Sequence, residues 1–279
     1  MNHMIGWIVG LICSSVIAGA AYMKKSLTMS GASGAILLGT TMYALGSIAW
    51  YGVLIAFFVS STLLTKLKQQ RKTAAESGYA KSGNRDMGQV AANGGIGLLL
   101  CIFNACWPHP YWWIAFIGVM GAVTADTWAT EIGGLSRSTP RSILNGRKVA
   151  PGTSGGITGL GVAASALGGL FIGLIGWLFL QVDDVGGINL GYVLLVGLTG
   201  GLVGSLGDSL MGASIQVMYR CKACGRDVET KNHCNHPTEK IRGLQWFNND
   251  TVNIIASILG GALAVRIYKS AIELIDLLR

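Results

Sequence analysis

Three carboxylates interrupt long apolar stretches of this chain. Asp126 and Glu131 lie in AVTADTWATEIGG, and Asp208 lies in GSLGDSLMGASIQ. A charged group inside an apolar segment is costly and usually lines a site or a pathway. Carboxylate oxygens are also the protein ligands that Mg²⁺ takes when it holds a phosphate. The three acids are therefore candidate catalytic metal ligands. The alternative is that the aspartates form helix-to-helix hydrogen bonds or caps and that Glu131 is merely solvated.

The spacing of the first two acids sets a condition on this interpretation. Five residues correspond to about 140° around an ideal helix. Asp126 and Glu131 can therefore share one site only if the helix ends or unwinds between them, as the following Gly133-Gly134 pair would allow.

A basic segment rich in glycine, PRSILNGRKVAPGTSGGITGLG, follows these acids. We expect its turn to open the next helix, where backbone N–H groups, hydroxyls and nearby cations form a natural phosphate cradle. A flexible loop followed by glycine-mediated helix packing is the alternative. The candidate nucleotide-binding residues are Arg147, Lys148, Gly152, Thr153, Ser154 and Gly155.

Two further polar clusters stand at the starts of apolar segments. GLQWFNNDTVN places Asn249 and Asp250 at the start of the last one, where Asp250 would also serve as a helix N-cap. RDMGQVAANGG places Arg85 and Asn93 on one helical face, for which a solvated helix start is the alternative. Together with Ser209, these residues complete the predicted substrate-binding set.

Cysteines form a separate cluster with metal-ligand spacing. Cys221, Cys224, Cys234 and His236 give C-x2-C-x9-C-x-H, with His233 as a spare imidazole. Three thiolates and one imidazole can make a closed tetrahedral zinc site, which is typically structural. Unpaired or redox-active thiols are the alternative, and a stable disulfide is disfavoured because we expect this segment to be cytoplasmic.

Apolar runs long enough to span a bilayer occupy most of the chain. They predict an all-α, polytopic transmembrane bundle of about eight helices, or seven if the second and third form one span. The predicted helices cover 4–23, 31–47, 49–65, 88–105, 111–133, 156–180, 189–217 and 251–268. We expect one membrane domain over 1–279, with a cytoplasmic cysteine-rich loop inserted at 218–246.

Basic residues predict the orientation of these helices. If eight helices cross the membrane in alternating directions, 18 of the 21 Lys and Arg residues lie in segments on the same side of the membrane. This excess identifies that side as cytoplasmic. The N-terminus is then outside, the polar motifs described above lie on the cytoplasmic half, and the protein is a multi-pass protein of the cell membrane.

Composition excludes several classes of protein. The chain is 51% hydrophobic and only 12% charged, with 41 glycines, which does not fit an ordinary soluble or disordered protein. The net charge of +8 is explained by the basic residues of the cytoplasmic loops, which anionic membrane lipids would attract. No nucleic-acid partner is expected.

The motifs ADTWATEIGG, PGTSGGITGLG, GDSLMGASIQ and NNDTVN resemble the transmembrane-protein-19 family, which includes plant phytyl phosphate kinases. The order of the motifs is more loosely similar to CTP-dependent membrane transferases such as phosphatidate cytidylyltransferase and dolichol kinase. The resemblance implies transfer of a phosphoryl group from a nucleoside triphosphate, expected to be CTP, to an isoprenyl monophosphate lipid. It implies that Asp126 and Asp208 hold Mg²⁺ and that Glu131 assists them. The cysteine segment is a departure from the plant members.

Two other functions remain as alternatives. A nucleotidyltransferase would use the same groups to form a CDP-lipid. A transporter or flippase would also place acids in glycine-rich helices, although the polar groups cluster on one face instead of at the membrane midplane. The sequence is compatible with a homo-oligomer.

Overall fold

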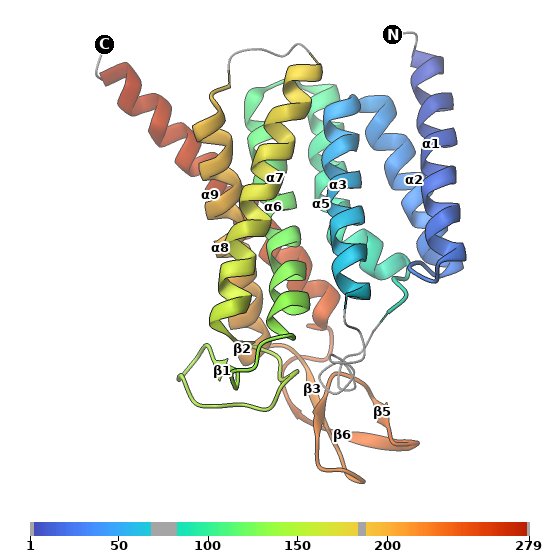
Figure 1. Ribbon diagram of the computed structural model, residues 1–279, viewed down its shortest axis with the longest axis vertical. Coiled ribbons are helices and arrows are strands. Elements are labelled where there is room, and N and C mark those ends of the chain that lie inside the picture. The colour runs from blue at the N-terminus through green and yellow to red at the C-terminus, as the bar shows by residue number, and fades with distance from the viewer. Residues whose placement is uncertain (1–2, 68–82, 184–187, 278–279) are drawn as a thin grey trace.

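The computed structural model describes residues 3–67, 83–183 and 188–277, and in these ranges eight long helices form a bundle (Figure 1). The helices are α1 (His3–Met23), α2 (Met29–Leu45), α3 (Ile48–Lys66), α5 (Met87–Cys106), α6 (Pro110–Gly133), α7 (Gly159–Val182), α8 (Leu190–Ser214) and α9 (Asn249–Leu277).

Polar caps explain where several of these helices begin. Thr28 accepts a hydrogen bond from Gly31 N at the start of α2, and Asp86 and Gln89 form a reciprocal capping box at the start of α5. Pro110 occupies the first turn of α6, where its missing N–H has no cost. The predicted helix positions agree with these bounds to within a few residues at most ends.

Six of the described helices are long and apolar enough to cross a membrane: α1, α3, α5, α7, α8 and α9. Helix α2 has only 17 residues, and α6 carries Asp126 and Glu131 in its second half. The count of seven or eight spans therefore stays a prediction. Helix α1 begins and α9 ends at the same end of the bundle in Figure 1, as an even number of crossings requires.

Helix α6 is the centre of the bundle and contacts α5, α7, α8 and α9. Every residue from Trp113 to Ala125 is buried, so this helix has no lipid-facing stripe over that stretch. Glycines allow the surrounding helices to approach closely. A Cβ atom on Gly169 of α7 would lie 2.4 Å from the Gly197 carbonyl oxygen of α8, which leaves no room for a side chain.

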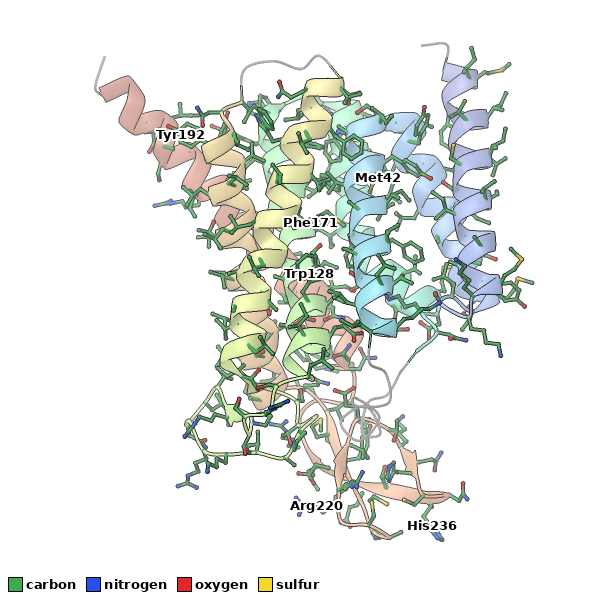
Figure 2. All side chains as sticks on the ribbon, in the orientation of Figure 1. Met42, Trp128, Phe171, Tyr192, Arg220 and His236 are labelled. Atoms are coloured by element: carbon green, nitrogen blue, oxygen red, sulfur yellow. The ribbon has the colours of Figure 1, made fainter. Side chains whose placement is uncertain are left out.

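Short strands gather at the opposite end of the bundle (Figure 1). Strands β1 (Arg141–Ser142) and β2 (Gly156–Ile157) pair antiparallel, and a second, four-stranded sheet has the order β4-β3-β6-β5. This sheet comprises β3 (Met218–Cys221), β4 (Asp227–Val228), β5 (Asn232–His233) and β6 (His236–Arg242). Figure 2 shows Arg220 and His236 in it, far from Tyr192 at the other end of the molecule.

The sheet corrects one prediction, because the fold is not purely α-helical; within 218–246, expected as an inserted cysteine-rich loop, the chain forms strands. Val217, Tyr219 and Val228 form a small hydrophobic core of their own. Arg242 at the end of β6 donates hydrogen bonds to the Gly212 and Ala213 carbonyl oxygens. A cation at the C-terminus of a helix satisfies its last carbonyls and its dipole, so Arg242 fastens the sheet to α8.

Candidate active site

A polar cavity of about 360 Å³ lies at the strand-bearing end of the bundle. This volume is in the range of small-molecule binding sites. Residues from α3, α5, α6, α7, α8, α9 and several loops line it, so segments far apart in the sequence converge here. The predicted site residues that line it are Arg85, Asn93, Asp126, Glu131, Gly152, Thr153, Ser154, Gly155, Asp208, Ser209, Asn249 and Asp250.

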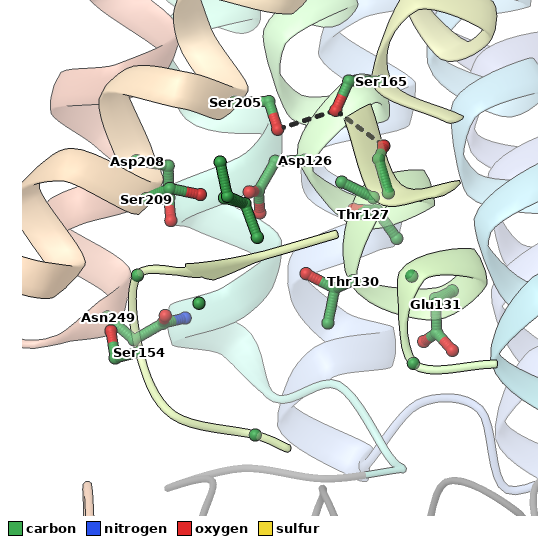
Figure 3. Close-up of a pocket in the computed structure, with 18 of the residues that line it drawn as sticks. Asp126, Thr127, Thr130, Glu131, Ser154, Ser165, Ser205, Asp208, Ser209 and Asn249 are labelled. Atoms are coloured by element: carbon green, nitrogen blue, oxygen red, sulfur yellow. Dashed lines mark hydrogen bonds between the residues drawn. The ribbon is translucent and has the colours of Figure 1, made fainter. Parts of the chain in front are cut away.

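Asp126 of α6 and Asp208 of α8 share the inner part of the cavity (Figure 3). The two carboxylates lie close enough for the charge of Asp126 to act on Asp208. The Oδ2 atom of Asp208 is buried and has no hydrogen-bond partner among the described residues. Two neighbouring carboxylates with an unpartnered oxygen fit the ligand set of a hard divalent cation, which would relieve both the repulsion and the missing hydrogen bond.

Glu131 lines the same cavity, but on the side of α3 and not beside the two aspartates. Helix α6 continues through it to Gly133, so the unwinding that a shared Asp126–Glu131 site would need is not present in this described segment. The Glu131 carboxylate turns toward α3, where it accepts a hydrogen bond of 2.6 Å from Thr65 Oγ1. Figure 3 shows it apart from the two aspartates. Its role as a metal ligand stays a prediction.

The glycine-rich turn reaches the cavity in a different way from the one predicted. Helix α7 begins only at Gly159, with Thr158 as its N-cap, and residues 156–157 form β2 instead of a first helical turn. Thr153 and Ser154 therefore line the cavity from a turn ahead of β2 and not from a helix N-terminus.

Close packing against α8 fixes this turn. Gly155 has a φ of +80°, and a Cβ atom there would lie 2.3 Å from the Ala213 Cβ, so only glycine fits. The Ser154 hydroxyl donates a hydrogen bond of 2.9 Å to Gln216 Oε1 just beyond α8.

Arg147 and Lys148 are not among the described residues that line the cavity. Both are exposed in the segment that follows β1, where the Arg147 carbonyl oxygen accepts a hydrogen bond from Ser142 N. The structure therefore does not bring these two cations to the aspartates.

The polar residues at the start of α9 have two different roles. Asn248 Oδ1 accepts a hydrogen bond of 3.0 Å from Thr251 N, so Asn248 supplies the N-cap that was expected from Asp250. Asn249, Asp250 and Asn253 line the cavity from the first two turns of the helix.

Arg85 has a fixed backbone and a buried head group. Its N–H donates to the Ser26 carbonyl oxygen, and its own carbonyl oxygen accepts from Thr28 N, each at 3.0 Å. The guanidinium carbon lies 5.6 Å and 5.9 Å from the ring centroids of Phe57 and Phe58. Burial lowers the pKa of Arg85, and the negative charge of Glu131 acts in the opposite direction.

Glu229 lines the cavity and was not assigned from the sequence. Glu229 reaches it from the segment after β4 and accepts a hydrogen bond of 2.9 Å from the buried Gln216 Nε2. Ser154, Gln216 and Glu229 thus form one connected set that joins the glycine-rich turn to the sheet. No local pattern marks Glu229, because its place depends on the fold of the sheet.

The cysteine cluster can hold a metal, but with a different histidine from the one predicted. Ligand atoms of Cys221, Cys224, His233 and Cys234 all lie within 4.8 Å of one another. The Nδ1 atom of His233 is 3.3 Å from Cys234 Sγ and 3.5 Å from Cys224 Sγ. A hydrogen bond with the His233 side chain is the largest of the effects that lower the pKa of the Cys221 thiol to about 6, which favours the metal-binding thiolate.

His236 is excluded from this cluster by the local turn. Cys234 and Asn235 both have positive φ, 51° and 59°, and form the two-residue turn between β5 and β6. The chain reverses after Cys234, which leaves the histidine before the turn, and not the one after it, beside the thiols.

Comparisons with known proteins agree with this architecture. A family model described as integral membrane protein DUF92 matches residues 12–261. The chain is 30% identical to Protein PGR of Arabidopsis thaliana, covering 90% of this chain and 92% of that protein. It is also 30% identical to the uncharacterized membrane protein MJ0933 of Methanocaldococcus jannaschii, covering 96% of this chain and 97% of that protein.

A more distant relative is the Arabidopsis thaliana Protein VTE6, chloroplastic, which is 25% identical and matches 92% of this chain and 70% of its own length. No solved structure matches the chain. The expectation of a polytopic membrane-protein family with plant members is confirmed: this chain is an integral, multi-pass membrane protein and belongs to the integral membrane protein DUF92 family.

Proposed function

We propose that this protein is a Mg²⁺-dependent lipid phosphate kinase. It would transfer the terminal phosphoryl group of CTP to an isoprenyl monophosphate at the cytoplasmic membrane face and release the isoprenyl diphosphate and CDP. The observation that carries this proposal is the pair of half-buried aspartates, Asp126 and Asp208, in one polar cavity at the end of a membrane bundle. The motif resemblance to a family that includes phytyl phosphate kinases supports the choice of substrate.

Asp126 and Asp208 would hold the Mg²⁺, and the unpartnered Asp208 Oδ2 suits that task. When bound, the ion would neutralise negative charge on the phosphates and help to align them. Thr153 and Ser209 offer hydroxyl donors for phosphate oxygens, and the amide of Asn249 offers two more.

The reaction needs no nucleophilic side chain. An oxygen of the lipid monophosphate forms the new bond to the γ-phosphorus of CTP, and the bond between that phosphorus and the β-phosphate oxygen breaks. The acceptor is already largely an anion at neutral pH. The protein therefore contributes positioning and charge neutralisation, which are the main requirements of phosphoryl transfer. Arg147 and Lys148 remain proposed contacts for the outer part of the nucleotide.

The test is to incubate the purified protein in detergent with Mg²⁺, labelled CTP and a panel of prenyl monophosphates, and to identify every product by mass. CDP together with a prenyl diphosphate supports the proposal. Pyrophosphate with a CDP-lipid would replace it by nucleotidyl transfer. No turnover with any lipid or with ATP, GTP or UTP would count against catalysis and make transport the next hypothesis.

We further propose that the metal at the cysteine cluster is a structural zinc ion. Zn–S bonds of about 2.3 Å and Zn–N bonds of about 2.0 Å in a tetrahedron place N and S atoms about 3.5 Å apart. The His233 Nδ1 distances of 3.3 Å and 3.5 Å to two thiols agree with that geometry. Four protein ligands leave no open position, so the ion would stabilise the sheet that carries Glu229 to the cavity.

A further inference from the structure

An apolar groove adjoins the polar cavity and shares one wall with it. Arg85, Gln89 and Asn93 line both. The rest of the groove is formed by α1, α2, α3 and α5, and its lining includes Ile17, Ala35, Leu38, Leu54, Phe58 and Val90. The polar cavity therefore continues into a hydrocarbon-like space through a side of the bundle that lies away from α8 and α9.

The groove is short. It encloses about 60 Å³, and its lining runs from Ser14 to Ala18 on α1, from Ala35 to Gly39 on α2 and from Leu54 to Phe58 on α3. Four residues of helix correspond to about 6 Å of length. Such a groove holds only the first carbons of a long chain, and the remainder must lie between the helices and the bilayer.

Arg85 stands where the two spaces meet. Its Nη1 atom is buried and has no hydrogen-bond partner among the described residues. Two phenylalanine rings hold the guanidinium, and its backbone is tied to the turn between α1 and α2. The charge is thus positioned without using this donor, and a planar guanidinium with a free donor is suited to a phosphate.

We infer that the groove is the entry and specificity site for the lipid substrate, a phosphate monoester on a single apolar chain. Arg85 would bind its phosphate, and the α1–α2–α3–α5 groove would hold its first carbons. The inference rests on the proposed function and deepens it. Charge complementarity selects an anionic head, and the narrow apolar lining favours one chain over the two of a phospholipid.

The role of Arg85 is tested by lipid binding without nucleotide. Native mass spectrometry or tryptophan fluorescence would compare farnesyl monophosphate with farnesol, which lacks the phosphate. A charged hydrogen bond corresponds to a loss of about 10- to 100-fold in affinity. We expect that loss for the monophosphate in Arg85→Gln, partial recovery in Arg85→Lys, and no change for farnesol. Lys66→Gln, which removes an exposed cation at the end of α3, is the control. Unchanged monophosphate binding in Arg85→Gln would overturn the inference.

The groove itself is tested by filling it. Ile17→Trp places a large ring in the lining of the groove. The control is Val16→Trp, which places the same ring one residue away on the same helix, at a position whose native side chain is 66% exposed. Ile17→Trp should weaken binding of farnesyl and geranylgeranyl monophosphate by a similar factor, about 10-fold or more, because both share their first carbons. Equal effects of the two tryptophans, a loss restricted to the longer chain, or equally tight binding of two-chain phosphatidate would each overturn it.

These measurements separate the two proposals. Binding that depends on Arg85 and Ile17 without any transfer from CTP would leave the groove in place and remove the kinase. Transfer that is unaffected by both substitutions would keep the kinase and place the lipid elsewhere.

Discussion

Among single residues, Asp208 offers the sharpest test of the proposed chemistry. Replacement by asparagine keeps the shape but removes the charge that would hold Mg²⁺, so Asp208→Asn should lower turnover by more than about 100-fold. Thermal unfolding in detergent should be unchanged or shifted upward, because a buried unpaired carboxylate is costly to the folded state. The measurement is the rate of CDP formation beside the melting temperature.

Asp183→Asn is the matched control for that substitution. Asp183 accepts hydrogen bonds from Ser47 Oγ and Ala49 N at the far end of the bundle, and asparagine retains an acceptor there. Its turnover should stay close to that of the original protein. Full activity in Asp208→Asn would remove Asp208 from the metal site.

Residue-level reasoning from the sequence singles out polar groups that contrast with their surroundings. Asp126 and Asp208 stand out in apolar helices, and the cavity brings them together. The same reasoning could not choose His233 over His236, because the choice depends on two positive φ angles in one turn. It could not find Glu229, which reaches the cavity only through the fold of the sheet.

At the scale of elements, the cysteine-bearing sheet should depend on its metal. His233→Ala removes one of four ligands and should lower zinc affinity by about 10-fold or more and also lower the melting temperature. His236→Ala removes an exposed histidine three residues away and should retain both. Zinc content by mass spectrometry, and the visible spectrum of the cobalt-substituted protein as a test of tetrahedral thiolate coordination, would measure the difference.

A converse result, with zinc lost in His236→Ala and kept in His233→Ala, would restore the ligand set expected from spacing alone. The absence of zinc and of a cobalt spectrum in the unmodified protein would leave the thiols as a redox or unpaired group.

The helices were predictable because long apolar runs and polar caps carry their signal locally. The four-stranded sheet was not, since three of its strands span only two to four residues and long-range pairing defines them. The turn ahead of α7 was misjudged for a similar reason: pairing of β2 with β1 takes residues 156–157 out of the helix.

At the scale of the whole molecule, the uneven distribution of basic residues predicts the orientation in the membrane. The exposed Cys106 and Arg137 belong to opposite ends of the bundle, at the end of α5 and in the segment after α6. A membrane-impermeant maleimide should label Cys106 in intact cells, whereas the variant Arg137→Cys in a Cys106→Ser background should be labelled only after permeabilisation. Gel shift would measure both with the cysteines of the sheet left in place, and the reverse pattern would place the cavity outside the cell.

The central position of α6 also bears on how the protein is made. The fully buried middle of α6 contacts other helices instead of lipid, so the place of α6 in the bundle depends on α7, α8 and α9, which are synthesised after it. Asp126 therefore meets Asp208 only once the ribosome has delivered α8. An incomplete polypeptide would hold neither half of the site in working order and would remain a substrate for membrane quality control.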